Sequence, residues 1–166
     1  QPDMITFGKG MGGELPMAGV IMRKELAQQL DAGSQPQTFA ANALSAAVCM
    51  TNIEIIQKNE LIARASELGK ETILVLQQAA ERLEIIGEVR GRGLMIGIEL
   101  VASRETKEPL SGDRMEKVVG GLLSRGIIMV PCGRNGNVLR LMPSLTITRE
   151  YMKKAVDILV SVLKDS

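Results

Sequence analysis

The sequence predicts an α/β first half followed by a smaller α+β lobe. Short apolar segments flank a glycine cluster near the N-terminus, two long helical patterns occupy the middle, and short strands alternate with helices after residue 83. The chain has 166 residues, of which 45% are hydrophobic and 23% charged, so it is long enough to bury a core and does not have the composition of a disordered chain.

The composition excludes several classes of function. Lys and Arg number 20 against 19 Asp and Glu, and this formal charge of +1 provides no strong field for nucleic acid or an anionic membrane. Histidine is absent, which excludes imidazole zinc ligands and histidine-activated nucleophiles. Cys49 and Cys132 form no C-x-x-C pair, so we expect no metal site and a reducing, cytoplasmic setting. No apolar run approaches the roughly 20 residues of a spanning helix, so we expect no membrane association.

Two buried strands are predicted in the first half. The apolar run 4–7 ends in a glycine cluster that contains Lys9, and the β-rich run 16–22 follows, leading into a short polar helix. The polar segment 31–37, with its Gly, Ser and Pro residues, is typical of a loop. Two strands are too few for a parallel sheet covered on both faces, so this half is expected to be incomplete.

Helical periodicity governs the middle of the chain. Asn42 is a favourable N-cap for a helix that continues to Ile56. After residues 58–59, a stripe of apolar residues at steps of three and four predicts a longer helix that ends near Leu83. This second helix is long enough to link two lobes.

The second half begins with the runs 87–93 and 94–100, and in the latter Met95, Gly97 and Glu99 alternate with more apolar residues, which predicts either a strand pair or one bent strand. Ser111 is predicted to cap a helix that ends at Gly126.

Two further short strands, 127–131 and 138–142, are predicted to form a hairpin, because the pair Asn135-Gly136 lies between them. Thr148 is then predicted to cap a final amphipathic helix.

The glycine cluster contains the spacing G-x-G-x-x-G, but its context does not fit a dinucleotide site. Pro16 leads into another strand, where that site needs a helix, and Lys9 precedes most of the glycines, which excludes the Walker pattern. A lysine between glycines is open to close approach and partial desolvation, so it can act as a nucleophilic amine. The alternative is a solvated lysine in an ordinary turn.

Four ordered motifs, at residues 2–20, 38–44, 91–99 and 138–148, together resemble the class III aminotransferases, which are pyridoxal-phosphate enzymes of fold type I. The 4-aminobutyrate and ω-amino acid transaminases are the most similar subgroup.

This resemblance implies a partial fold type I large domain in residues 1–58, a linking helix in residues 59–82 and a small C-terminal α+β domain in residues 83–166.

The resemblance also assigns three site residues. Lys9 is similar to the Schiff-base lysine, which binds the cofactor aldehyde and then moves a proton during the reaction. Thr38 is similar to the threonine that reaches the cofactor phosphate of the partner subunit, and Arg140 to the arginine that pairs with the substrate carboxylate. From the residues alone, Thr38 could be an ordinary loop hydroxyl, and Arg140 could point from its strand into water. Ala41 and Ala43 depart from the glycine and proline usual in the family.

The implied activity is transamination between an amino acid or ω-amino acid and a 2-oxo acid, in a homodimer with sites at the subunit interface. Racemisation, an aminomutase shift, decarboxylation and a non-catalytic assembly role remain open. The family's phosphate loop, its ring-stacking aromatic residue and its pyridinium aspartate all precede the lysine strand and have no counterpart here. The chain is therefore expected to be a carboxyl-terminal fragment with little or no activity in isolation.

Overall fold

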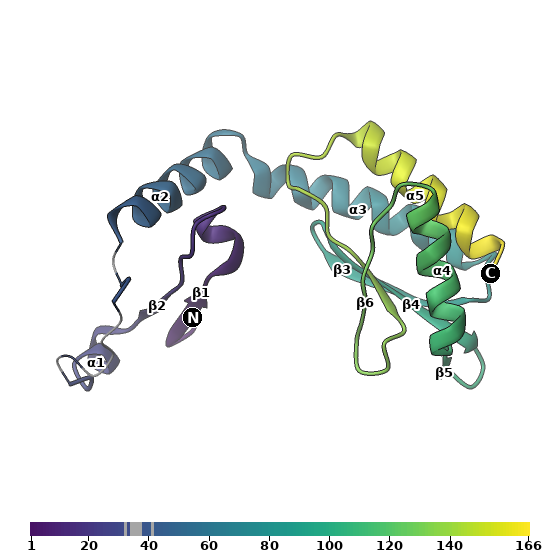
Figure 1. The fold of residues 1–166 in the computed structure, drawn as a ribbon, viewed down its shortest axis with the longest axis horizontal. Helices are drawn as coiled ribbons and strands as arrows, with labels where there is room; N and C mark the ends of the chain where they lie inside the picture. Colours follow the sequence, from purple (N-terminus) through teal and green to yellow (C-terminus); the bar gives the residue numbers. More distant parts are fainter. Residues whose placement is uncertain (32, 34–37, 41) are drawn as a thin grey trace. The chain divides into compact units, whose positions relative to one another are not determined.

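The computed structural model describes residues 1–31, 33, 38–40 and 42–166, which group into two units, Gln1–Glu60 and Leu61–Ser166 (Figure 1). Most of the predicted loop at 31–37 lies outside the described residues. Among the described helices, none is both long and apolar enough to cross a membrane.

In the first unit, strands β1 (Met4–Phe7) and β2 (Gly19–Met22) form an antiparallel pair. Both strands were predicted, but β2 begins three residues later than expected. The prediction that they are buried is wrong for this chain: Ile5 is 50% exposed and Ile21 63% exposed. The two residues lie opposite each other in the pair, and the described part of the first unit supplies no layer that covers them.

The first unit also contains a 3₁₀ turn, η1 (Lys9–Gly12), and two helices, α1 (Lys24–Ala27) and α2 (Ala43–Lys58). Asn42 is the N-cap of α2, as predicted, and its Oδ1 accepts a hydrogen bond of 3.0 Å from the backbone N–H of Ser45. This cap fixes the first turn of a helix that packs against η1.

The second unit is an antiparallel sheet with three long helices. Its elements are α3 (Leu61–Ala80), β3 (Ile86–Arg92), β4 (Met95–Ser103), β5 (Glu108–Pro109), α4 (Gly112–Ser124), β6 (Pro131–Cys132), β7 (Val138–Leu141) and α5 (Arg149–Lys164). The strand order is β3-β4-β7-β6, and β5 pairs with β4.

One face of this sheet forms the core. Ile96 and Ile98 of β4 and Leu139 of β7 are fully buried, in one cluster with apolar side chains from α3, α4 and α5. The alternate residues of β4, including Met95 at 61% exposure, point to the opposite face. The alternation that predicted the 94–100 strand therefore reports a sheet with one covered face.

Several predicted boundaries in the second unit are confirmed and two expectations need correction. Thr148 caps α5, and its Oγ1 accepts from the N–H of Tyr151. Ser111 occupies the N-cap of α4 but makes no capping hydrogen bond with its side chain. The predicted strand 127–131 is reduced to β6, because only Pro131 and Cys132 pair with β7 and the preceding residues, such as Ile128 at 83% exposure, stay unpaired.

Helix α3 groups with the sheet of the second unit, and Leu68 and Leu76 on it enter the core. The division of the described chain thus falls at residues 60 and 61. The domain boundaries inferred from the family resemblance, at 58 and 82, remain a prediction.

Candidate active site

Lys9 begins η1, the turn that connects β1 to the loop before β2. Its backbone φ is +55°, a left-handed conformation that non-glycine residues rarely adopt. The turn is closed by hydrogen bonds from the N–H of Met11 to the Gly8 carbonyl and from the N–H of Gly13 to the Gly10 carbonyl, each 3.2 Å.

The close packing of η1 against Met17, in the loop before β2, also depends on glycine. A Cβ at Gly12 would lie 2.7 Å from the Cβ of Met17, which is closer than real Cβ atoms approach. The glycine cluster recognised in the sequence therefore brings the chain before β2 against the turn that carries Lys9.

Helix α2 holds the turn from its own side. The side-chain amide of Asn52 donates to the Gly10 carbonyl at 2.7 Å and to the Met11 carbonyl at 3.3 Å. Four residues earlier, Val48 lies beside Gly13, so one face of α2 meets η1 over a full helical turn.

A cavity of about 740 Å³ opens beside the turn, and Lys9 is among the residues that line it. Phe39, Ala40, Asn42 and Ser45 line it as well, so the cavity also adjoins the N-terminus of the 16-residue helix α2. Free backbone N–H groups and the helix dipole make such an end favourable for an anion. The arrangement thus combines one primary amine with one anion-favouring helix end.

Two of the three predicted site residues belong to the first unit and one belongs to the second. Lys9 is exposed, and its glycine neighbours leave the amine open to approach rather than desolvated by the described residues. Thr38 is exposed in the turn that continues into Phe39 and Ala40, and this brings its segment to the rim of the cavity. Arg140 belongs to the second unit.

Arg140 lies in β7, opposite Gly97 of β4, and Gly97 in turn lies opposite Arg90 of β3. The two guanidinium groups thus extend from the same, uncovered face of the sheet. Arg90 pairs with Glu88 and Glu99, each at 2.6 Å, and the hydrogen bond that it donates to Glu99 is the main cause that raises the pKa of Arg90.

Arg140 is exposed, and its side chain has no ion-pair or hydrogen-bond partner among the described residues. It therefore presents a charged fork that could bind a carboxylate bidentately.

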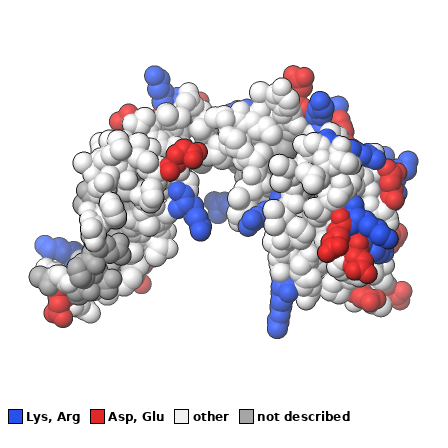
Figure 2. All heavy atoms as spheres, in the orientation of Figure 1, with Lys and Arg blue, Asp and Glu red and all other residues white. Residues whose placement is uncertain are grey.

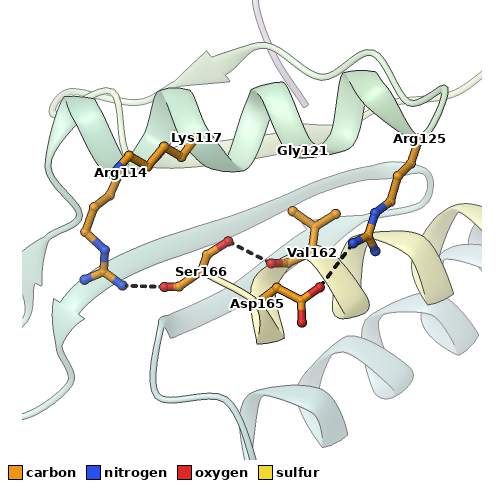
Figure 3. Close-up of a pocket in the computed structure, with 7 residues that line it drawn as sticks. All are labelled: Arg114, Lys117, Gly121, Arg125, Val162, Asp165 and Ser166. Atoms are coloured by element: carbon orange, nitrogen blue, oxygen red, sulfur yellow. Dashed lines mark hydrogen bonds and ion pairs between the residues drawn. The ribbon is translucent and has the colours of Figure 1, made fainter.

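A second cavity lies in the second unit, between α4 and α5 (Figure 3). The residues that line it are connected by ion pairs and hydrogen bonds. Arg125 donates to Ser161 at 2.8 Å and pairs with Asp165 at 3.1 Å, and Arg114 donates to the Ser166 carbonyl at 3.0 Å. These arginines connect the two helices α4 and α5.

On the face drawn in Figure 2, acidic and basic side chains are interspersed, in keeping with the net charge of +1.

Sequence reasoning missed Asn52 and Ser45. In the sequence, each is one polar residue within a helical pattern, where a solvent-facing position is the ordinary expectation. Ser45 is in fact only 7% exposed and lines the cavity, and Asn52 contacts residues more than 40 positions away. The one signal in the sequence that could have indicated them is their helical spacing from the predicted N-cap, Asn42, which places both on one face of α2.

Comparison with known proteins gives a consistent relationship over the whole chain. The family described as aminotransferase class-III matches residues 1–163. An alanine/serine racemase of Pyrococcus horikoshii is 38% identical over 166 residues, which are 100% of this chain and 34% of that protein. A 4-aminobutyrate aminotransferase of Mycobacterium leprae is 38% identical over 167 residues, covering 99% of this chain and 36% of that protein.

Among solved structures, a Bacillus anthracis aminotransferase superposes with a TM-score of 0.91 at 30% identity, covering 99% of this chain and 39% of that one. The chain thus spans between a third and two fifths of the length of these proteins. The matched family consists of pyridoxal-phosphate enzymes, which agrees with an exposed amine beside a helix N-terminus. With its family match extending over almost every residue, the chain belongs to the class III aminotransferases.

Proposed function

We propose that the protein is a pyridoxal-phosphate-dependent aminotransferase that acts on an amino acid or ω-amino acid and a 2-oxo acid. The observation that carries this proposal is the position of Lys9, which is among the residues lining a cavity next to the N-terminus of α2 in a chain of this family.

The residues that line the cavity fit this cofactor. Pyridoxal phosphate supplies an aldehyde that combines with amines and a ring that accepts electrons from the substrate carbon. Lys9 provides the amine, and the cavity of about 740 Å³ is within the usual size range for sites of small molecules.

Each of the three site residues has a distinct role in this proposal. The Nζ of Lys9 would hold the cofactor through its aldehyde and would serve as the group that moves a proton at the substrate carbon. The Thr38 hydroxyl would donate to a phosphate oxygen of the cofactor held by the partner subunit. The guanidinium of Arg140 orients the substrate through its carboxylate, for which its planar fork has the matching geometry.

We also propose how the chain is divided into domains and how it assembles. Residues 1–58 would be part of a fold type I large domain, residues 59–82 a linking helix and residues 83–166 the small α+β domain. The half-exposed apolar side chains of β1 and β2 suit a chain that packs against further protein, and we propose a cytoplasmic homodimer.

Selective labelling of Lys9 tests the proposed function. The chain is incubated with pyridoxal phosphate, reduced with borohydride and mapped by peptide mass spectrometry. We expect the label on Lys9 to form several-fold faster than on Lys24 and Lys58, which belong to the same unit and do not line the cavity.

Replacement of the amine provides the control for this labelling. The variant Lys9→Ala should lose the fast label, whereas Lys24→Ala should retain it. Equal labelling of Lys9, Lys24 and Lys58 in the unaltered chain would refute the assignment of Lys9.

Racemisation is a second candidate, favoured by the 38% identity to the alanine/serine racemase. Both reactions remove a proton from the α-carbon, but only transamination transfers the amino group to a 2-oxo acid. L-alanine and pyridoxal phosphate are therefore supplied in parallel with and without 2-oxoglutarate, and pyruvate and D-alanine are both measured. Pyruvate formation that depends on the acceptor supports transamination, whereas D-alanine formed without an acceptor supports racemisation.

A further inference from the structure

We propose that Asn52 is a positioning residue for Lys9, acting through the backbone of η1. This inference rests on the proposed function, in which the Lys9 amine is the reactive group. It assigns to the middle of α2 a role in holding that amine at the cavity.

The backbone at Lys9 needs support. At a φ of +55°, the Cβ of a lysine crowds its own backbone, and such a conformation persists only where the surrounding structure fixes it. The adjacent glycines cannot provide that support, because glycine adopts many backbone conformations with little cost. The hydrogen bond from the Met11 N–H to the Gly8 carbonyl spans Lys9 and restrains the turn from within, and contacts from outside the turn add to this restraint.

Asn52 makes such contacts at the second and third peptide groups after Lys9, which carry the carbonyls of Gly10 and Met11. A primary amide carries two N–H donors, and those of Asn52 are directed at the carbonyls of Gly10 and Met11. The Gly10 carbonyl also accepts from the N–H of Gly13, so the side chain joins the hydrogen bond that closes the turn. Fixing these two peptide planes limits the rotation of the Lys9 backbone and thus the direction in which its side chain leaves the turn.

The support for Asn52 is itself rigid. Asn52 lies in the middle of α2, whose N-terminus is capped by Asn42 and lines the same cavity as Lys9. One helix therefore borders the cavity with its first turn and holds the lysine turn with its third. A shift of η1 along α2 would break both amide hydrogen bonds.

Two measurements on the 166-residue chain test this role. The first is hydrogen exchange of the amides in residues 8–15, which requires no cofactor. The second is the rate at which pyridoxal phosphate and borohydride label Lys9 relative to Lys24.

The variants are Asn52→Leu, which removes both donors, Asn52→Gln, which keeps a primary amide, and Thr51→Ala as a matched control. Thr51 is the neighbouring residue on α2, and its hydroxyl bonds to the Ala47 carbonyl within its own helix.

With Asn52→Leu, we expect faster exchange in residues 8–15 and a several-fold lower ratio of Lys9 to Lys24 labelling, while α2 and α5 keep their protection. Asn52→Gln should restore part of both losses, and Thr51→Ala should cause neither.

Unchanged exchange in residues 8–15 with Asn52→Leu would overturn the inference. So would faster exchange that leaves the labelling ratio intact, or loss of protection throughout α2, since either would make Asn52 a merely structural residue. If the unaltered chain shows no preference for Lys9, the proposed function fails, and the exchange data alone still decide whether Asn52 holds the turn.

Discussion

At the scale of single residues, two glycines within helices predict opposite effects of the same substitution. A Cβ at Gly69 of α3 would lie 2.0 Å from the carbonyl oxygen of Gly93, a backbone atom that no rotamer change can remove. Gly69→Ala should therefore lower the free energy of unfolding by about 3 kcal/mol, at the upper end of overpacking effects.

Gly120 of α4 provides the matched control, because a Cβ there would meet no atom within 4 Å. Gly120→Ala should raise the free energy of unfolding by roughly 0.5–1 kcal/mol, since alanine loses less backbone entropy in a helix. Urea unfolding followed by far-ultraviolet circular dichroism measures both. Similar midpoints for the two variants would contradict the close contact between α3 and Gly93.

The same scale shows what the sequence could and could not predict about the site. Lys9 and the cap Asn42 were found because a lysine among glycines and a short polar residue ahead of a helical stripe are local patterns. The left-handed backbone of Lys9 and its support by Asn52 were not found, because the hydrogen bond to Gly10 spans 42 residues. No periodicity within α2 indicates a contact at that separation.

At the scale of secondary-structure elements, the two predicted hydroxyl caps of the second unit differ in what they contribute. Thr148 accepts a hydrogen bond of 3.2 Å from the N–H of Tyr151 at the start of α5, whereas the Ser111 side chain makes none at α4. Thr148→Ala should therefore cost about 1 kcal/mol of stability, and Ser111→Ala only a few tenths. Thermal unfolding of the two variants tests this, and an equal loss for both would show that the caps are equivalent in solution.

The strands were predictable to the extent that side-chain burial alternates along them. The residues of β3 and β4 were predicted to be extended nearly in full, because in β4 Ile96, Ile98 and Leu100 enter the core while Gly97 and Glu99 between them do not. The apolar run from Ile127 to Val130 resembles a strand equally well, yet it does not pair with β7. Hydrophobicity alone cannot distinguish an unpaired apolar segment from a strand when the partner lies elsewhere in the chain.

At the scale of the whole molecule, the two units differ in how much of each is buried. The second unit has one core to which three helices and the strands β3, β4 and β7 contribute. Among the described residues of the first unit, the buried ones are Gly12, Ser45 and Cys49. The mixed α/β character of the chain could be predicted from the sequence, but the exposure of β1 and β2 could not, because their apolar composition is that of strands that lie inside a larger sheet.

This difference predicts two levels of local stability within one chain. Amides of β4, which lies between β3 and β7, should exchange only when the second unit unfolds, because opening this strand exposes much of the core. Amides of β1 and β2 should exchange far faster, since an isolated two-stranded pair with half-exposed apolar side chains is marginally stable.

Hydrogen exchange at two protein concentrations separates this intrinsic difference from the effect of assembly. At low concentration, β1 and β2 should be the least protected strands, and slow exchange there comparable to that of β4 would contradict the two levels. If the proposed homodimer covers the apolar side chains of β1 and β2, their protection should rise with concentration while that of β4 stays constant. Protection that rises equally in both units would place the contact between copies elsewhere.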